Sequence, residues 1–182
     1  LYGVPEQRLS VLPNGIDLAA VDAARAGRQG STRGELAHFP RRAIFTGSDV
    51  RHNRSAVQAI LTRIAPSLER EIEFVIVGPC ARGVRVNGSP NVCLDLDGDI
   101  SAYAGPGVVG LNPVVAGSGS SMKLLHYLAC DLPVLSTPFG LRGFKDLAPW
   151  VVTAELDQFP EALRREPPAP DGVRKYLARY EW

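Results

Sequence analysis

The chain has 182 residues, with 20 basic and 19 acidic side chains and a formal net charge of +1. Its hydrophobic content of 45% and charged content of 21% are ordinary for a soluble globular protein. This balance gives no reason to expect a nucleic-acid surface or an electrostatic membrane patch. The length suits one domain with a sizeable core and is marginal for two.

The three cysteines, Cys80, Cys93 and Cys130, show neither CxxC spacing nor a His/Cys cluster. We therefore expect reduced thiols in a cytoplasmic protein, with no zinc site. No apolar run approaches the roughly 18 residues of a membrane-spanning helix. No signal peptide is visible, and because Leu1 lies close to an expected strand, we expect the natural N-terminus to be missing.

The first half of the chain alternates expected strands and helices. A helix that Asn53 can cap carries an apolar stripe with a period of 3.6 residues, formed by Val57, Ile60, Leu61, Ile64 and Leu68. The Gly-, Arg-, Ser- and Thr-rich segment 27–40 is expected to be a loop or linker. The other expected elements are strands at Ser10–Leu12, Ala43–Thr46 and Ile72–Val77, and a helix at Leu18–Ala26.

The second half continues the alternation, and its strands are short. Expected strands are Val92–Leu94, Val108–Leu111, Pro133–Ser136 and Trp150–Val152, and expected helices are Ile100–Ala104, Ser120–Cys130, Phe159–Arg164 and Gly172–Tyr180. The strands are continuous apolar runs, which is typical of a parallel sheet covered by helices on both faces. The sequence thus predicts a three-layer, Rossmann-like α/β fold, with residues 1–182 as one domain.

Small or polar pairs end four of these strands: Gly47-Ser48, Gly78-Pro79, Asn112-Pro113 and Thr137-Pro138. In an open parallel sheet, ligands bind beyond the carboxyl ends of the strands. Small residues there let a ligand approach the backbone, so we expect the binding site at this edge.

A glycine-serine loop, Gly117-Ser118-Gly119-Ser120-Ser121, connects a buried strand to an expected helix. The backbone amides from Gly119 to Met122 could hold a diphosphate there, and Lys123 would neutralise it. The alternative is a flexible connection with a surface lysine. Neither a Walker loop nor the dinucleotide fingerprint is present.

The segment NPVVAGSGSSMKLLHYLACDLPVLSTPFGLRG closely resembles the donor loop of retaining GT-B glycosyltransferases of the group 1, or family 4, type. AIFTGSDVRHNRSAVQAI and EFVIVG resemble the first two strands of their C-terminal domain. YGVPEQRLSVLPNGID resembles the entry to that domain, and YEW resembles the aromatic ending before its last helix. The resemblance covers most of the chain. It implies the C-terminal, donor-binding half of a GT-B fold, without the N-terminal acceptor domain.

The resemblance also implies an activity. The intact protein would transfer a hexose from a nucleoside diphosphate sugar to a glycan or lipid-linked acceptor in polysaccharide biosynthesis, with retention of configuration and without a metal or cofactor. This chain alone would be inactive. Association with a membrane surface would be possible through the missing domain.

The resemblance assigns roles to single residues. Lys123 and Arg51 would be the catalytic charges on the leaving diphosphate, although a solvated turn is the alternative for Arg51. Gly47 and Ser48 would line the phosphate site, with Ser48 where relatives often carry Arg. Arg142 lies in GLRG, which resembles the wall beside the donor.

His126 departs from the family pattern, in which a Glu or Asp three residues after the lysine binds the ribose hydroxyls. An imidazole cannot make that bidentate contact, and its loss would weaken binding by about 1–3 kcal/mol. Our hypothesis is that His126 replaces this contact; the alternative is a helix residue without a ligand role. Ser118 likewise stands where many relatives carry another Glu.

These departures keep two other functions open. One is a degenerate, non-catalytic module that binds a nucleotide or a partner. The other is a related GT-B nucleotide-sugar epimerase or phosphorylase, although acidic catalytic residues for an epimerase cannot be placed in this sequence and none of its three lysines lies in the cofactor-lysine motif of a phosphorylase. Asp95, Asp97 and Asp99 lack the frame of a calcium loop, and Asp99 is expected to cap the short helix after it.

Overall fold

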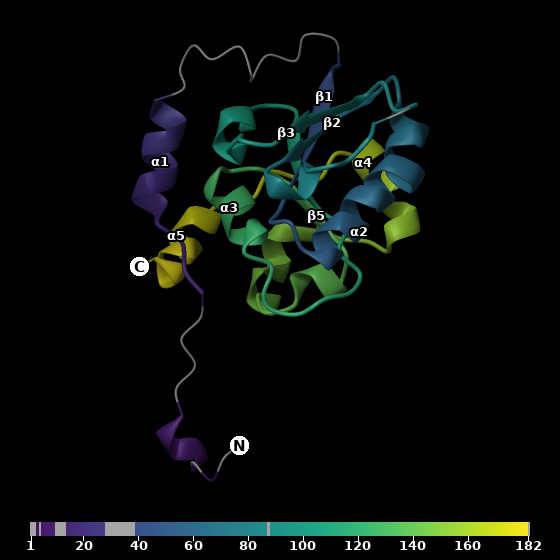
Figure 1. Cartoon of the computed structure of the whole chain (residues 1–182). Coiled ribbons are helices and arrows are strands. Elements are labelled where there is room, and N and C mark those ends of the chain that lie inside the picture. The colour runs from purple at the N-terminus through teal and green to yellow at the C-terminus, as the bar shows by residue number, and fades with distance from the viewer. Residues whose placement is uncertain (1–2, 4, 10–13, 28–38, 87, 182) are drawn as a thin grey trace.

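Six parallel strands form a sheet at the centre of the computed structural model, which describes residues 3, 5–9, 14–27, 39–86 and 88–181 (Figure 1). The strand order is β3-β2-β1-β4-β5-β6, so the chain starts in the middle and winds first to one side and then to the other. This is the doubly wound arrangement that the sequence predicts. The strands are β1 Arg41–Thr46, β2 Ile72–Val77, β3 Val92–Asp95, β4 Val108–Asn112, β5 Val134–Ser136 and β6 Val151–Thr153.

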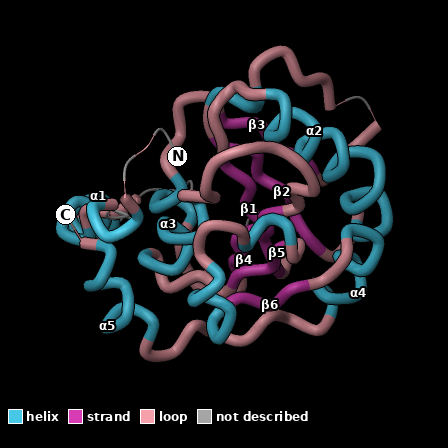
Figure 2. Tube along the Cα trace, turned by 90° about the horizontal axis from the view of Figure 1, so that it is seen from below, coloured by secondary structure: helices cyan, strands magenta, loops and turns pink. Residues whose placement is uncertain are grey.

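Helices cover both faces of the sheet (Figure 2). Helices α2 (Arg51–Ala59) and α4 (Phe159–Arg164) lie on one face, and α1 (Leu18–Ala26), α3 (Lys123–Ala129) and α5 (Val173–Leu177) lie on the other. Alternate residues of β1 belong to different cores: Ile44 packs with α3 and α5, whereas Phe45 packs with α2 and α4. The continuous apolar strands are therefore buried on both faces, as predicted, and the fold has three layers.

The helical segment after β1 runs to Leu68 as predicted, but its hydrogen bonding changes along the way. Helix α2 continues as a π-helical turn, Ile60–Ile64, and then as a 3-10 turn, Ala65–Leu68. Pro66 has no N–H to donate, so the α-helical ladder cannot continue through it. Other 3-10 turns are Glu6–Arg8, Pro79–Ala81, Ile100–Tyr103, Phe139–Leu141, Lys145–Trp150, Leu156–Gln158 and Ala178–Tyr180.

Two predictions about helix starts are wrong. Val50, not Asn53, is the N-cap of α2, and Asn53 lies inside the helix with its side chain turned toward the carboxyl edge of the sheet. Helix α3 begins at Lys123 rather than Ser120, because Ser121 Oγ lies in hydrogen-bonding distance of Asn112 instead of starting the helix. The prediction that Asp99 caps a short helix is confirmed, since its carboxylate accepts from Ser101 N–H at 2.7 Å.

The remaining predicted elements differ from the structure mostly by one or two residues at their ends. Leu18–Ala26, Ile72–Val77 and Phe159–Arg164 agree with the structure. Gly172–Tyr180 is α5 followed by a 3-10 turn. The predicted strand Ser10–Leu12 and most of the loop 27–40 lie outside the described residues.

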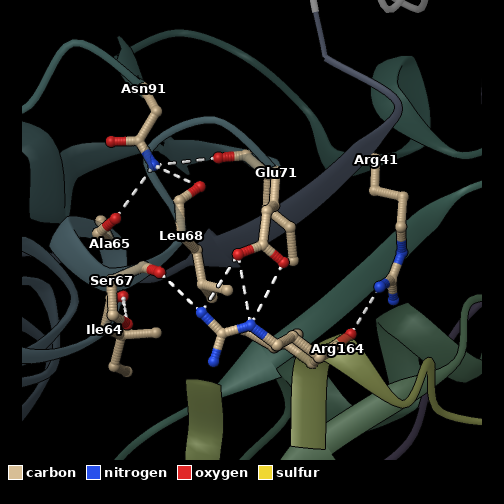
Figure 3. A network of polar contacts seen from close by, with 10 residues as sticks. Arg41, Ile64, Ala65, Ser67, Leu68, Glu71, Asn91 and Arg164 are labelled. Atoms are coloured by element: carbon tan, nitrogen blue, oxygen red, sulfur yellow. Dashed lines mark hydrogen bonds and ion pairs between the residues drawn. The ribbon is translucent and has the colours of Figure 1, made fainter. Parts of the chain in front are cut away.

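A polar network fastens the helical segment to the amino side of the sheet (Figure 3). The buried Asn91 donates through Nδ2 to the carbonyls of Ala65, Leu68 and Ile72, at 3.1, 3.3 and 3.0 Å. Arg164 of α4 pairs with Glu71 and donates to the Ser67 carbonyl at 2.8 Å. These contacts hold the end of the helical segment against the start of β2.

Gly110 on β4 makes room for the ring of Tyr127. A Cβ on Gly110 would lie 2.5 Å from Tyr127 Cγ, and Gly110 pairs with Ile44 near the middle of the sheet. The Tyr127 hydroxyl donates to the Leu111 carbonyl at 3.1 Å and accepts from Thr46 N–H at 3.0 Å. Tyr127 therefore holds α3 against the ends of β1 and β4.

We predict that Gly110→Ala lowers the free energy of unfolding by about 1–3 kcal/mol, because the added methyl group overlaps a ring with no space to move. Urea denaturation would measure the change. Gly105→Ala is the matched control, since a Cβ there meets nothing within 4 Å. An equal effect of the two substitutions would contradict the role given to Gly110.

We predict that Glu166→Gly stabilises the protein. Glu166 follows α4 in the left-handed region, with φ 56°. Relief of that backbone strain should add about 0.5–1 kcal/mol, visible as a higher melting temperature. Asp131→Gly, at φ 57°, should add less because it also removes the ion pair with Arg25. A lower melting temperature for Glu166→Gly would contradict this account.

Candidate functional site

A cavity of about 470 Å³ lies at the carboxyl edge of the sheet, where the sequence predicts a site. We call it the central cavity. It gathers residues that follow β1 and β2 and residues near the start of α3. Its lining is Thr46, Gly47, Ser48, His52, Asn53, Gly78, Pro79, Gly98, Ser120, Ser121, Met122, Lys123, His126 and Arg142. Eight of the predicted site residues are thus brought together: Gly47, Ser48, Ser120, Ser121, Met122, Lys123, His126 and Arg142.

A second cavity, of about 540 Å³, lies next to the central cavity and shares His52 with it. We call it the side cavity. It is mostly apolar and lies between α2 and the segment that follows β4. Its lining is Arg51, His52, Ser55, Ala56, Ala59, Pro113, Val115, Ala116, Gly117, Ser118 and Leu156. The predicted residues Arg51, Gly117 and Ser118 therefore face this cavity, and Gly119 is exposed between the two groups.

Lys123 is the most constrained cation of the site. Its ammonium group donates to Asn53 Oδ1 at 2.8 Å and lies 4.5 Å from the centre of the Phe45 ring. Burial lowers its pKa to about 8, and the nearby Arg142 acts in the same direction. No carboxylate of the described residues pairs with it. Lys123 is thus a partly desolvated positive charge whose ammonium group, within the described ranges, contacts an amide and an aromatic ring and no carboxylate.

Asn53 connects this lysine to the end of β1. Its Nδ2 donates to the Ser48 carbonyl at 3.0 Å while its Oδ1 accepts from Lys123. A Cβ on Gly47 would lie 2.6 Å from Asn53 Cγ, so the close approach of this side chain requires glycine. Asn53 is only 4% exposed. It fixes the Lys123 ammonium beside the turn after β1.

Asn112 anchors the glycine-serine loop from below. This fully buried side chain donates through Nδ2 toward Ser121 Oγ at 3.2 Å, Ser136 Oγ at 3.1 Å and the Gly140 carbonyl at 3.0 Å. On the outer side, Arg142 donates to the Ser118 carbonyl at 3.0 Å and packs over Phe139. The loop is therefore tied to the ends of β4 and β5, rather than being a free connection.

Several backbone amides of this loop are available to a ligand. The N–H groups of Gly119, Ser120, Ser121 and Lys123 have no partner among the described residues, whereas Met122 N–H donates to the Ser120 carbonyl at 3.1 Å. The amides predicted to hold a diphosphate are thus partly engaged. Helix α3 has seven residues, so its dipole adds little to Lys123.

The two histidines that line the central cavity each line a second cavity as well, and the second cavity is different for each. His126 lies where the cavity adjoins a smaller one under α1, and partial burial lowers its pKa while Asp99 opposes the change. His52 is half-buried between the central and side cavities. Burial, followed by repulsion from Lys123 and Arg142, lowers the pKa of His52.

The acidic segment that begins at the end of β3 has structural roles. Asp99 caps the turn that follows, and the Asp95 carboxylate accepts a hydrogen bond from the Tyr103 hydroxyl. Within the described ranges, no group of His, Cys, Asp and Glu side chains could hold a metal ion. The three cysteines are free thiols, and two of them, Cys80 and Cys130, are buried.

Sequence reasoning missed Asn53 and His52 as site residues, and it named Asn112 only as part of a strand-ending pair at this edge. Asn112 carried a signal, since it is a polar residue at the end of an otherwise apolar strand. Asn53 also had one, but helix capping explained it equally well. His52 had no local signal, because its neighbours Gly117, Lys123 and Arg142 lie far from it in the sequence.

No protein-family model and no curated protein matches this sequence. Solved structures do match it. WaaG, a glycosyltransferase involved in lipopolysaccharide biosynthesis, is 19% identical with a TM-score of 0.56; the match covers 97% of this chain and 51% of that one. A UDP-forming α,α-trehalose-phosphate synthase from Burkholderia xenovorans is 16% identical, with a TM-score of 0.57, 92% of this chain and 46% of that one covered.

The glycosyltransferase SnogD from Streptomyces nogalater gives a similar match, with 19% identity, a TM-score of 0.54, and coverage of 97% of this chain and 48% of that one. The chain thus spans about half the length of these proteins. None of the helices in the part of the chain that the structure describes is long and apolar enough to cross a membrane. The chain has the three-layer α/β fold found in one half of these GT-B glycosyltransferases.

Proposed function

We propose that this chain is the donor-binding half of a glycosyltransferase of the hexosyltransferase type, and that a nucleoside diphosphate sugar binds in the central cavity. One observation carries the proposal: Lys123 is a partly buried cation without a carboxylate partner among the described residues, and it lines a cavity at the carboxyl edge of a parallel sheet. Burying such a charge costs free energy unless an anion pairs with it. The shared fold of glycosyltransferases supports the choice of anion.

The chemistry follows from where the negative charge would develop. When the sugar leaves, the diphosphate gains charge on the oxygen that breaks its bond to the sugar. Lys123 and Arg142 both line the central cavity and would stabilise that charge, and their partial burial strengthens the effect. The amides of Ser120 and Ser121 would add neutral donors. Arg51 faces the side cavity and would act on the sugar or acceptor side.

The nucleoside would lie toward His126. The cavity lining also includes Gly78, Pro79 and Gly98, and the two glycines, which have no side chain, would leave room for a base. His126 would then hydrogen-bond a ribose hydroxyl in place of a carboxylate.

The free thiols support a cytoplasmic location for the protein.

A second candidate is a nucleotide-binding module without transferase activity. The imidazole at His126 and the hydroxyl at Ser118, where relatives commonly carry carboxylates, favour it. Transfer of sugar by a protein that contains this chain and an acceptor domain would exclude it. An epimerase is less well supported, since the described residues lining the central cavity include no carboxylate.

We predict that one of UDP, GDP and ADP binds saturably to this chain in calorimetric titration, and that Lys123→Ala weakens it about tenfold, or about 1.4 kcal/mol. The substitution removes the charge that faces the diphosphate. Lys175→Ala is the matched control, because Lys175 is an exposed lysine on α5. An unchanged affinity in Lys123→Ala would contradict the proposed site.

We predict that affinity for the same nucleotide falls as the pH rises through about 8, the pKa of Lys123 in the empty site. Below that pH the lysine is charged before the ligand arrives, whereas above it binding must also take up a proton, so affinity falls by up to about tenfold per pH unit. Titrations at pH 7, 8 and 9 would measure this. Lys123→Arg should flatten the profile, because arginine stays charged; an unchanged slope in that variant would assign the effect to another group.

A further inference from the structure

His52 stands in the wall between the central and side cavities and lines both of them. The backbone of the glycine-serine loop lies close to its ring, since a Cβ on Gly117 would lie 2.8 Å from His52 Cγ and 2.9 Å from Nδ1. The imidazole, which projects from the first turn of α2, is therefore held against the loop where the two cavities meet. A side chain fixed there can reach a ligand that also contacts Lys123.

The groups that face His52 are mostly cationic. Lys123 comes from α3 and Arg142 from the segment after β5, and both repel a proton on the imidazole. On its own helix, Arg51 is a neighbour, and Arg54 is paired with Asp49 at 2.8 Å. The loop side contributes the backbone of Gly117. Burial and these cations keep the pKa of His52 below its ordinary value, so the ring is neutral near pH 7 in the empty site.

We infer that His52 is a third anion-binding residue of the central cavity, and that it binds the diphosphate of a ligand as an imidazolium, so that anion binding takes up a proton. This inference rests on the proposed function for the identity of the natural anion. It adds a proton-binding residue to the site that neither the glycine loop nor the lysine supplies.

The physical reason is the reversal of the local field. Without a ligand, His52 faces two positive charges, and protonation is unfavourable. A dianion between Lys123, Arg142 and His52 cancels that repulsion and adds attraction, which favours the charged ring. Proton uptake and anion binding then strengthen each other by linkage. The effect spans the interval between the lowered pKa of His52 in the empty site and its raised pKa in the occupied site, below the window in which Lys123 titrates.

The test is an NMR titration of the histidine rings of this chain in sodium sulfate and in sodium chloride at equal ionic strength. Sulfate serves as the probe because it stays dianionic over the whole pH range. His52→Gln identifies the His52 signals among those of the three histidines. Lys123→Met and the matched Lys175→Met then show whether the response depends on the cavity.

We expect a His52 midpoint below that of a free histidine in chloride, raised by about one pH unit in sulfate. The rise should disappear in Lys123→Met and persist in Lys175→Met. A midpoint that does not respond to sulfate, or that responds equally in both lysine variants, would overturn the inference.

A parallel titration with UDP-glucose and GDP-mannose, whose diphosphates do not titrate in this range, separates this inference from the proposed function. If one of them binds with Lys123 dependence while the His52 midpoint stays in place, the donor site stands and the role of His52 is wrong. If sulfate raises the His52 midpoint but neither nucleotide sugar binds, the anion site is supported and the proposed donor is wrong.

Discussion

The hydroxyl of Tyr127 accepts a hydrogen bond from the end of β1 and donates one to the end of β4, deep inside the fold. Its ring lies against Gly110, the strand position that has no side chain to obstruct it. Burial raises the pKa of the phenol far above its ordinary value, although the hydrogen bond from Thr46 N–H acts in the opposite direction, so the hydroxyl remains a neutral donor. Because α3 has only seven residues and little stability of its own, this anchoring fixes where the helix begins.

The position of Lys123 follows from that anchor. It is the first residue of α3, one helical turn before Tyr127, and its side chain therefore extends over the end of β1, above the Phe45 ring. Asn53 on α2 and Asn112 at the end of β4 complete the frame. The site is thus a set of polar side chains fixed by buried packing, with the exposed loop residues supported from beneath.

The fold follows closely from the sequence because apolar runs and strand-ending residues are local signals. Ile72–Val77 is six residues of nearly continuous apolar character, and the structure has the same strand. The start of α3 was harder to predict, since Ser120 and Ser121 are common N-cap residues and only the tertiary contact of Ser121 with Asn112 shows that they stay in the loop. The predicted gathering of residues at the carboxyl edge agrees with the structure for Gly47, Lys123 and Arg142, which share one cavity. Arg51 faces the side cavity and does not line the central cavity, whereas the next residue, His52, lines both. Successive side chains of a helix differ in direction by about 100°, so these neighbours face different surroundings.

The engagement of Lys123 by an amide and an aromatic ring has a thermodynamic consequence for the chain as a whole. Folding without a ligand brings Lys123 and Arg142 into one partly desolvated cavity, and none of the described carboxylates pairs with them. The empty site therefore lowers the stability of the folded state, unlike a surface on which charges are solvated or paired. Any anion that enters recovers part of this cost, and the folded state then becomes more resistant to heat as the anion concentration rises above its dissociation constant. The melting temperature of the purified chain should accordingly depend on the buffer. It should be higher in phosphate than in a zwitterionic amine at the same pH and ionic strength.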